Sequence, residues 1–351
     1  MNAGEIWWGR MGNSLQFLSR ISDTLRTHQS AIMQIPERFP WREEFRRQVD
    51  RNREQFSLRR RMIRLEWTGD EDPGAYILRE LTPRPVQAGY WPGQTPAEYL
   101  GSLGDLELCD MDVWVRGLHG REEVIRWAEF AGQYAAAAGR LERRAVFLLE
   151  YDGPAHQSAL LSSIVYQFDE YDARAFCLEL SLSGRSHRGY LTELAIRIGR
   201  GDPELCAALL SVGDRLAEDP AAAVEEILRR ETDAEGRPFP PIGEGEIASA
   251  VWRAAVVLLF PVLEEFRFDF ISRHEAELAK YLPITNSNGE QVTEPSDLEL
   301  GSLFYVVNIA NYAFSPADVE RVSQCRDVRN QLAHNKQIPY EEVRAVLEMS
   351  P

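Results

Sequence analysis

The chain has 351 residues, of which 44% are hydrophobic and 27% are charged, and its formal net charge is −16 at pH 7. This length is enough for two domains with cores of their own, and the composition is that of a globular protein. The negative charge excludes a general nucleic-acid coat, because binding along a phosphate backbone depends on positive charge.

The sequence lacks the features of an exported or membrane protein. The most apolar run, residues 254–263, is too short to span a bilayer and contains Pro261. The N-terminus lacks the basic start and apolar core of a signal peptide. The four cysteines are widely spaced and form no CxxC pair, so neither a zinc ribbon nor a disulfide framework is expected. We expect a cytoplasmic protein with no membrane partner, no metal site and no cofactor.

Residues 1–188 alternate helix-like and strand-like segments. Apolar runs typical of strands lie at residues 31–35, 62–67, 111–115 and 144–150. Helical spacing or capping signals lie at residues 14–25, 43–56, 95–100 and 122–138. Residues 175–180 fit either a strand or a helix. This alternation predicts an α/β domain with a mostly parallel sheet over residues 1–188.

The chain has no intact P-loop for binding a nucleotide. That loop needs a lysine between a glycine and a serine or threonine, and the only lysines, Lys280 and Lys336, lack such neighbours. The nearest match, residues 9–14, has Asn13 in place of the lysine. It reads as a degenerate phosphate loop or as an ordinary helix start. We therefore expect no ATP hydrolysis by the N-terminal domain.

Three polar residues, Glu150, Asp152 and His156, come at or just after the end of the apolar run at residues 144–150. Chemistry in α/β proteins is often placed at strand ends, and carboxylates with a histidine can bind a metal. The other reading, which we favour, is a turn with incidental polar side chains.

From residue 189 the pattern is helical only. Residues 189–232 form a predicted helical extension, in which Asp202 and Asp219 each cap a helix that starts with proline. Residues 233–246 are rich in glycine and proline and predict a linker. Residues 247–351 then predict an all-α bundle, with helical segments at residues 247–278, 298–314, 316–334 and 340–349.

This order, an α/β domain followed by helices, is similar to that of ATPases of the signalling (STAND) group. The run at residues 146–150 resembles a Walker B strand that ends in an acid, here Glu150. Because the Walker A lysine is missing, the resemblance implies a degenerate nucleotide-binding domain, in effect a pseudo-ATPase.

One stretch near the C-terminus gathers several residues that are capable of chemistry. At about 100° per residue along a helix, Asn330 and His334 lie about 40° and 80° from Arg326. Val328 and Leu332 lie on the opposite side. Arg329, at about −60°, lies on the same broad side as Arg326, so the helix is expected to bury its apolar residues and to present two arginines, an amide and an imidazole together. Histidine transfers protons near neutral pH, and arginine stabilises a phosphoryl transition state.

The segment Arg329-Asn330-x-x-x-His334, in the form RNQLAH, resembles the signature of the HEPN superfamily. The resemblance covers about the last 105 residues, 247–351. Many HEPN domains are helical bundles that act as metal-independent endoribonucleases, in which a dimer brings two motifs to one cleft. Other members are inactive scaffolds or partner-binding modules.

The resemblance implies roles for four residues. His334 would be the acid or base in attack of a ribose 2′-hydroxyl on the adjacent phosphate. Arg329 would stabilise the negative charge, Asn330 would orient the phosphate, and Arg326 would assist substrate binding. It also implies RNA as the substrate, an endoribonuclease of toxin or antiviral-defence type, and a homodimer through the C-terminal domain. The N-terminal domain would sense a trigger or hold a protein partner. The alternative is a non-catalytic dimerisation protein with a pseudo-ATPase front domain.

Overall fold

A computed structural model describes residues 2–55, 60–69, 71–91, 93–103, 107–139, 144–181, 187–286, 288–310 and 313–349. Residue 56, at the end of a predicted helix, and residues 311–312, inside another, lie outside this set. The chain forms two compact units, Met1–Asp172 and Ala173–Pro351. Residues 173–188 of the predicted first domain, the predicted extension, the predicted linker and the predicted bundle all belong to the second unit.

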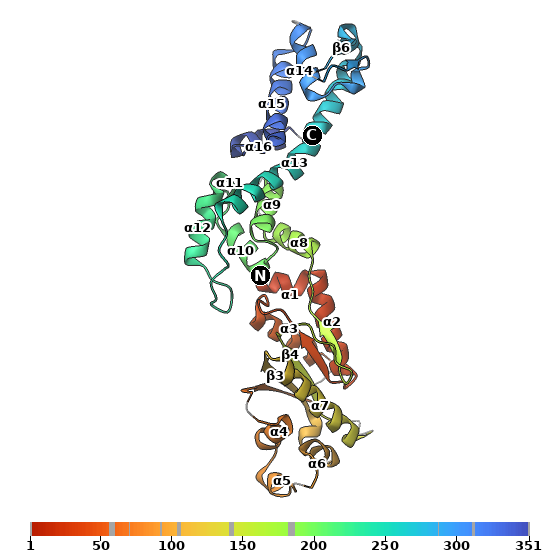
Figure 1. The fold of residues 1–351 in the computed structure, drawn as a ribbon, viewed down its shortest axis with the longest axis vertical. Helices are drawn as coiled ribbons and strands as arrows, with labels where there is room; N and C mark the ends of the chain where they lie inside the picture. Colours follow the sequence, from red (N-terminus) through yellow and green to blue (C-terminus); the bar gives the residue numbers. More distant parts are fainter. Residues whose placement is uncertain are drawn as a thin grey trace. The chain divides into compact units, whose positions relative to one another are not determined.

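The first unit contains a five-stranded parallel sheet, which confirms the predicted α/β class (Figure 1). Its strands are β1 (Ala31–Gln34), β2 (Arg61–Glu66), β3 (Met111–Leu118), β4 (Val146–Tyr151) and β5 (Ser162–Val165). Their order across the sheet is β2-β3-β4-β1-β5. The sequence did not indicate β5, which lies at the edge of the sheet and buries only Ile164.

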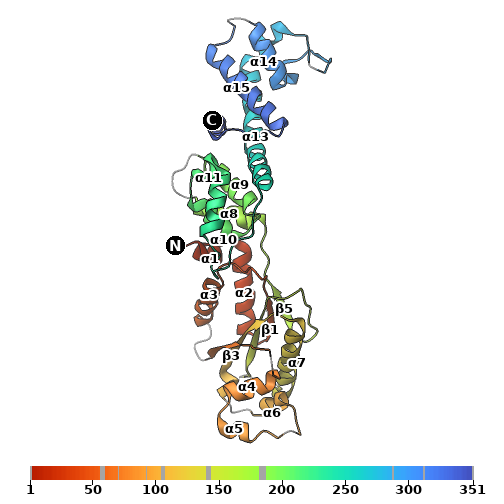
Figure 2. The ribbon, with the colours of Figure 1, turned by 60° about the vertical axis from the view of Figure 1, so that its left-hand side comes forward.

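Helices cover both faces of this sheet. The helical elements are α1 (Ala3–Arg10), α2 (Gly12–Arg26), α3 (Arg42–Glu54), α4 (Pro73–Leu81), α5 (Arg84–Ala88), α6 (Pro96–Ser102), η1 (Glu107–Asp110) and α7 (Arg121–Ala138). In both views α1–α3 lie on one side of the strands and α4–α7 on the other (Figure 2). On the α4–α7 side, Phe130 packs against Phe147 of β4, with ring centres 5.4 Å apart, in a core cluster that also contains Trp127 and Leu149.

The first two helices show that residues 9–14 do not form a degenerate phosphate loop, which would follow a strand. Gly9 lies inside α1 and Gly12 begins α2, so a helix and not a strand precedes the segment that resembled a phosphate loop. Asn13, which stands where the lysine would be, donates a side-chain hydrogen bond of 2.5 Å to Asp172. The sequence did not indicate α1, because Trp7 and Trp8 are adjacent and give no helical periodicity. Both indoles are buried.

The second unit is built from helices and one short hairpin. Its elements are α8 (Glu170–Leu180, which begins in the first unit), α9 (Arg188–Ile198), α10 (Pro203–Ser211), α11 (Arg215–Glu218), α12 (Pro220–Arg230), α13 (Glu244–Leu278), η2 (Ala279–Tyr281), β6 (Ile284–Thr285), β7 (Gln291–Val292), η3 (Pro295–Asp297), α14 (Leu300–Ile309), α15 (Pro316–Ala333) and α16 (Tyr340–Leu347). Residues 175–180, which fitted a strand or a helix, are helical. Asp202 and Asp219 cap α10 and α12 as expected, and Ser315 caps α15.

The 35-residue helix α13 supplies much of the core of this unit. It buries Leu259, Leu263 and Phe270 and contacts α9, α15 and α16. Among the described residues, only the helical stretch Glu244–Tyr281 is long and apolar enough to cross a membrane. It exceeds the apolar run seen in the sequence, because the helix continues through Pro261. A core helix meets the same criteria of length and composition.

The predicted linker contains ordered contacts. Asp233 is buried, accepts hydrogen bonds from the backbone and guanidinium of Arg237, and begins a turn in which Thr232 bridges Pro238. Phe239 is buried as well, and the helix α13 begins at Glu244. Glycine and proline therefore shape a packed turn in the first half of this segment.

Candidate functional site

The motif RNQLAH forms the last turn of α15 and the residue that caps it. Val328 and Leu332 are each 1% exposed, so the predicted buried side of the helix is confirmed. The helix ends at Ala333, and His334 is its C-cap, with a backbone N–H that donates to the carbonyl oxygen of Asn330. Asn335 follows with φ at 54°, a left-handed conformation that turns the chain away from the helix axis.

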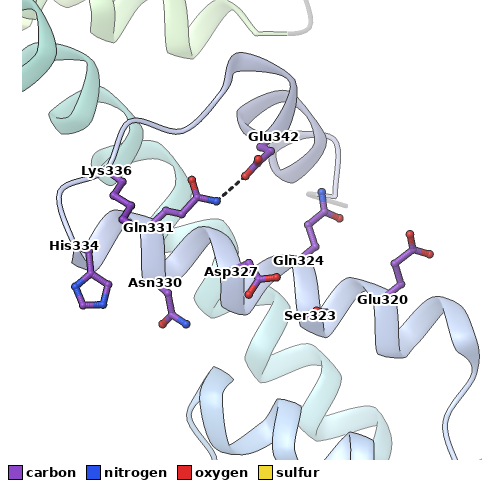
Figure 3. Close-up of a pocket in the computed structure, with 9 residues that line it drawn as sticks. All are labelled: Glu320, Ser323, Gln324, Asp327, Asn330, Gln331, His334, Lys336 and Glu342. Atoms are coloured by element: carbon purple, nitrogen blue, oxygen red, sulfur yellow. Dashed lines mark hydrogen bonds between the residues drawn. The ribbon is translucent and has the colours of Figure 1, made fainter.

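A pocket of about 810 Å³ lies along the exposed side of this helix, and we call it the His334 pocket. Its lining residues are Glu320, Ser323, Gln324, Asp327, Asn330, Gln331, His334, Lys336 and Glu342. Asn330 and His334 are both exposed and point to the same side of α15 (Figure 3). Two of the four residues named from the sequence therefore share this pocket.

Arg329 lies beside the pocket without lining it. Its side chain is 41% exposed, and its Nη1 donates a hydrogen bond of 3.4 Å to Oδ1 of Asn330. Its Nη2 is 3.7 Å from a carboxylate oxygen of Glu299, which is the N-cap of α14. The guanidinium is therefore held next to Asn330 by weak contacts, and an anionic substrate can compete for it.

Arg326 does not reach the pocket. Its guanidinium carbon is 3.6 Å from the centre of the Phe304 ring, a cation–π contact, and its Nε donates to Asp327 at 2.9 Å. Its side chain is 25% exposed. The helical wheel places Arg326 near Asn330, but α14 packs against this side of α15 and offers an aromatic ring that attracts the guanidinium.

The pocket also contains residues that the sequence did not indicate as site residues. Asp327 is seven residues before His334 and three before Asn330, so its place on the same face follows from helix periodicity. Lys336 and Glu342 come from beyond the helix end. Gln331 donates a hydrogen bond of 2.9 Å to Glu342 and thereby ties α15 to α16 (Figure 3). That pairing depends on how α16 packs, which the sequence pattern does not reveal.

The charge of the His334 pocket is negative as it stands. Glu320, Asp327 and Glu342 supply carboxylates, and Lys336 is the basic residue among its lining side chains. The guanidinium of Arg326 offsets Asp327. An RNA strand in this pocket would need Lys336, the arginines beside it or a second protomer to supply the positive charge.

The end of the sheet in the first unit offers a different arrangement. Open parallel sheets bind ligands beyond the carboxyl ends of their strands, and β1 and β4 are neighbours there. Glu150 of β4 is buried and accepts hydrogen bonds from Trp114, Arg46 and Arg42, at 2.8, 3.0 and 3.3 Å. A buried salt-bridge network thus occupies the position next to the start of α3.

The three polar residues expected after β4 do not gather around one point. Asp152 contacts His119 at 2.5 Å and Arg42 at 3.5 Å, whereas the backbone of His156 bonds to Gln34 at 3.4 Å. Among the described residues, no group of three or more histidines, cysteines and acids could hold a metal ion. Asp152 and His156 lie in the loop after β4, as the reading as a turn expects, whereas Glu150 lies in the strand itself and is held in the salt-bridge network.

Comparison with known proteins adds no relative to this description. No family model matches the chain, and no curated protein matches it either. The functional argument therefore depends on the residues of the His334 pocket and on their geometry.

Proposed function

We propose that the chain is a metal-independent endoribonuclease of toxin or antiviral-defence type, with a HEPN-like site in its C-terminal helices. The observation that carries this proposal is the exposure of Asn330 and His334 in one pocket of about 810 Å³. Arg329 is hydrogen-bonded to Asn330 at the edge of this pocket. A proton-transfer group, an amide donor and a guanidinium are the groups that phosphoryl transfer needs.

The reaction would be a transesterification within the RNA strand. The 2′-oxygen forms a bond to the adjacent phosphorus, the bond from phosphorus to the 5′-oxygen breaks, and no water or metal enters this step. One group takes the proton of the 2′-hydroxyl, and another gives a proton to the departing 5′-oxygen. His334 fills one of these roles, Arg329 neutralises the charge on the phosphorane, and Asn330 orients the phosphate. The products are a 2′,3′-cyclic phosphate and a 5′-hydroxyl.

A two-fold dimer completes this scheme. A single motif supplies one histidine, whereas the two proton transfers need two groups. In a two-fold dimer through the C-terminal helices, both protomers would present His334 to one cleft. The exposed face of α15 remains available for that contact, because Val328 and Leu332 point into their own unit. Lys336 within the pocket and Arg329 at its edge would then supply positive charge to the cleft.

The second candidate function is a non-catalytic dimerisation or partner-binding module with a pseudo-ATPase front unit. One observation favours it: the pocket is lined by three carboxylates and one lysine, an arrangement that repels a polyanion. The salt bridges of Glu150 with Arg42 and Arg46 fit a front unit without a bound nucleotide. In this reading the front unit would hold a protein partner.

The test is RNA cleavage by the full chain in EDTA, combined with light scattering at micromolar concentration. The nuclease proposal expects a dimer and products that end in a cyclic phosphate. It also expects that a single 2′-deoxy substitution at the cleaved position stops the reaction, because the nucleophile is then absent. A dimer that leaves every RNA intact would support the second candidate. Cleavage that needs a divalent metal, or that ignores the 2′-deoxy substitution, would contradict the nuclease mechanism.

A further inference from the structure

A second cavity, of about 560 Å³, lies in the same unit against the chain segment that follows His334. Its walls come from α9, the end of α11, the start of α12, the first turns of α13 and residues 337–340. We call it the Tyr190 cavity. Ile247, Val251 and Ile338 give it an apolar floor, and all three are buried. Its volume lies in the range of sites that hold small molecules.

Two tyrosines form an aromatic wall in this cavity. The rings of Tyr190 and Tyr340 are nearly parallel, at 11°, with centres 6.1 Å apart. Tyr190 is 1% exposed, and its hydroxyl makes no hydrogen bond to any residue that the structure describes. Burial raises the pKa of Tyr190 to about 12, so the hydroxyl keeps its proton at neutral pH. A ligand that donates a hydrogen bond in the cavity would find an acceptor in this hydroxyl oxygen.

The charged groups around the cavity are acidic. Glu218, Asp219 and Glu244 line it, and no arginine or lysine is among its lining residues. The carboxylate of Asp219 is engaged in capping α12, where it accepts from the backbone of Ala222 at 3.0 Å. Glu218 and Glu244 have no ion pair within the described residues, and both are exposed at the mouth. Two carboxylates are therefore available to a ligand.

We propose that the Tyr190 cavity binds a small organic cation, an amine or guanidinium carried on an apolar body. The apolar body would lie on Ile247 and Val251, the cationic head would face Glu218 and Glu244, and the aromatic wall would add a cation–π contact. A neutral ligand would leave the carboxylates unused, and an anion would be repelled. Free amines and the arginine side chain of a peptide share this chemistry.

The cavity and the His334 pocket share one short connection. His334 and Lys336 line the His334 pocket, whereas Gln337, Ile338 and Tyr340 line the Tyr190 cavity. A ligand against residues 337–340 would restrict this connection and so the position of His334. That consequence rests on the proposed nuclease function, whereas the binding itself does not.

Isothermal titration of the full chain with phenethylamine tests the binding, with 2-phenylethanol as the neutral match and N-acetyl-arginine amide as the peptide-like probe. We expect at least one of the two cations to bind about tenfold more tightly than the alcohol. The variant Glu218→Gln/Glu244→Gln should lose that preference, and Tyr340→Leu should weaken binding of the cation. Glu225→Gln, an exposed acid of α12 outside the cavity, is the matched control and should bind as the wild type does.

The relative affinities of the two cations identify the source of the ligand, a free amine or an arginine side chain. Equal binding of alcohol and amine, absence of binding by both cations, or full binding by the double variant would overturn the proposal. Circular dichroism of each variant checks that it folds. Because titration reads binding and not cleavage, a chain that binds the cation and cleaves no RNA contradicts only the nuclease.

Discussion

The indole Nε1 of Trp252 donates a hydrogen bond of 2.9 Å to the backbone carbonyl oxygen of Leu332. Trp252 belongs to α13, and Leu332 lies two residues before His334 in the last turn of α15. The same oxygen also accepts a hydrogen bond of 3.2 Å from the backbone N–H of Asn335, so the indole adds a second, side-chain donor at the helix end. It also fastens the end of α15, and with it the candidate site, to the central helix of the unit.

Replacing Trp252 tests this attachment. Trp252→Phe removes the N–H donor and keeps an aromatic ring, and we expect a loss of about 1 kcal/mol in the free energy of unfolding. Denaturant unfolding followed by circular dichroism measures it. Trp91→Phe is the control, because Trp91 is 75% exposed and should contribute little. Equal losses in both variants would show that the hydrogen bond does not stabilise this helix end.

The buried side of α15 makes a second prediction. Leu332→Ala removes a side chain that is 1% exposed, and we expect a cost of about 2–5 kcal/mol in unfolding free energy. Ile309→Ala, at a position that is 45% exposed in the same unit, should cost well under half of that. Chemical denaturation gives both values. A loss for Leu332→Ala no larger than that of the control would contradict the burial of this face.

The salt-bridge network at the end of the sheet gives a third prediction. Glu150→Gln removes a buried charge that faces Arg42 and Arg46, and we expect a loss of about 2–3 kcal/mol. The matched control is Glu66→Gln, whose carboxylate is 63% exposed and pairs with Arg116. That change should cost less than about 1 kcal/mol. Thermal unfolding of both variants measures these losses. A Glu150→Gln variant that is more stable than the wild type would contradict a stabilising role for the Glu150 charge.

The turn at Asp233 predicts a dependence on pH. Burial by itself raises the pKa of the Asp233 carboxyl, but hydrogen bonds from the backbone and guanidinium of Arg237 outweigh it. The pKa therefore lies below the ordinary value of 3.8. A carboxyl whose pKa is lower in the folded protein than in the unfolded chain stabilises the fold at pH values above its unfolded-state pKa. That stabilisation is lost as the pH falls through the folded-state pKa.

We therefore expect Asp233→Asn to lower the unfolding midpoint at pH 7, and the difference from wild type to shrink as the pH falls below about 4. Asp269→Asn is the control, because its carboxylate is 65% exposed and pairs with Arg273 on the surface. Unfolding midpoints across this pH range measure both variants. A difference that stays constant down to pH 3 or so would mean that the Asp233 charge plays no part.

The sequence predicted those parts of the fold and of the candidate site that have a strong periodic or capping signal. The side of α15 that buries Val328 and Leu332 follows from the helical period, and the start of α6 follows from the Thr95 and Glu98 capping box. The parallel sheet follows from the alternation of helices and strands. Each of these features depends on residues that are close in the sequence, so the pattern contains the information.

Other parts depend on contacts between distant segments. Arg326 is near Asn330 on the helical wheel, but Phe304 of α14 attracts its guanidinium away from the pocket. The strand β5 has one buried side chain and needs β1 as its neighbour. Glu342 enters the His334 pocket only because α16 folds back beside α15. The spacing of residues along the sequence predicts none of these placements.

The most direct test of the central claim is cleavage of RNA in EDTA by the full chain and by its His334→Ala variant. We predict cleavage by the wild type and a loss of about a hundredfold or more in the variant, because a proton-transfer group is removed. His119→Ala, which changes a histidine that is 72% exposed in the other unit, should cleave as the wild type does. Wild-type cleavage that survives His334→Ala unchanged would contradict the assignment of the site, and so would a wild type that leaves RNA intact.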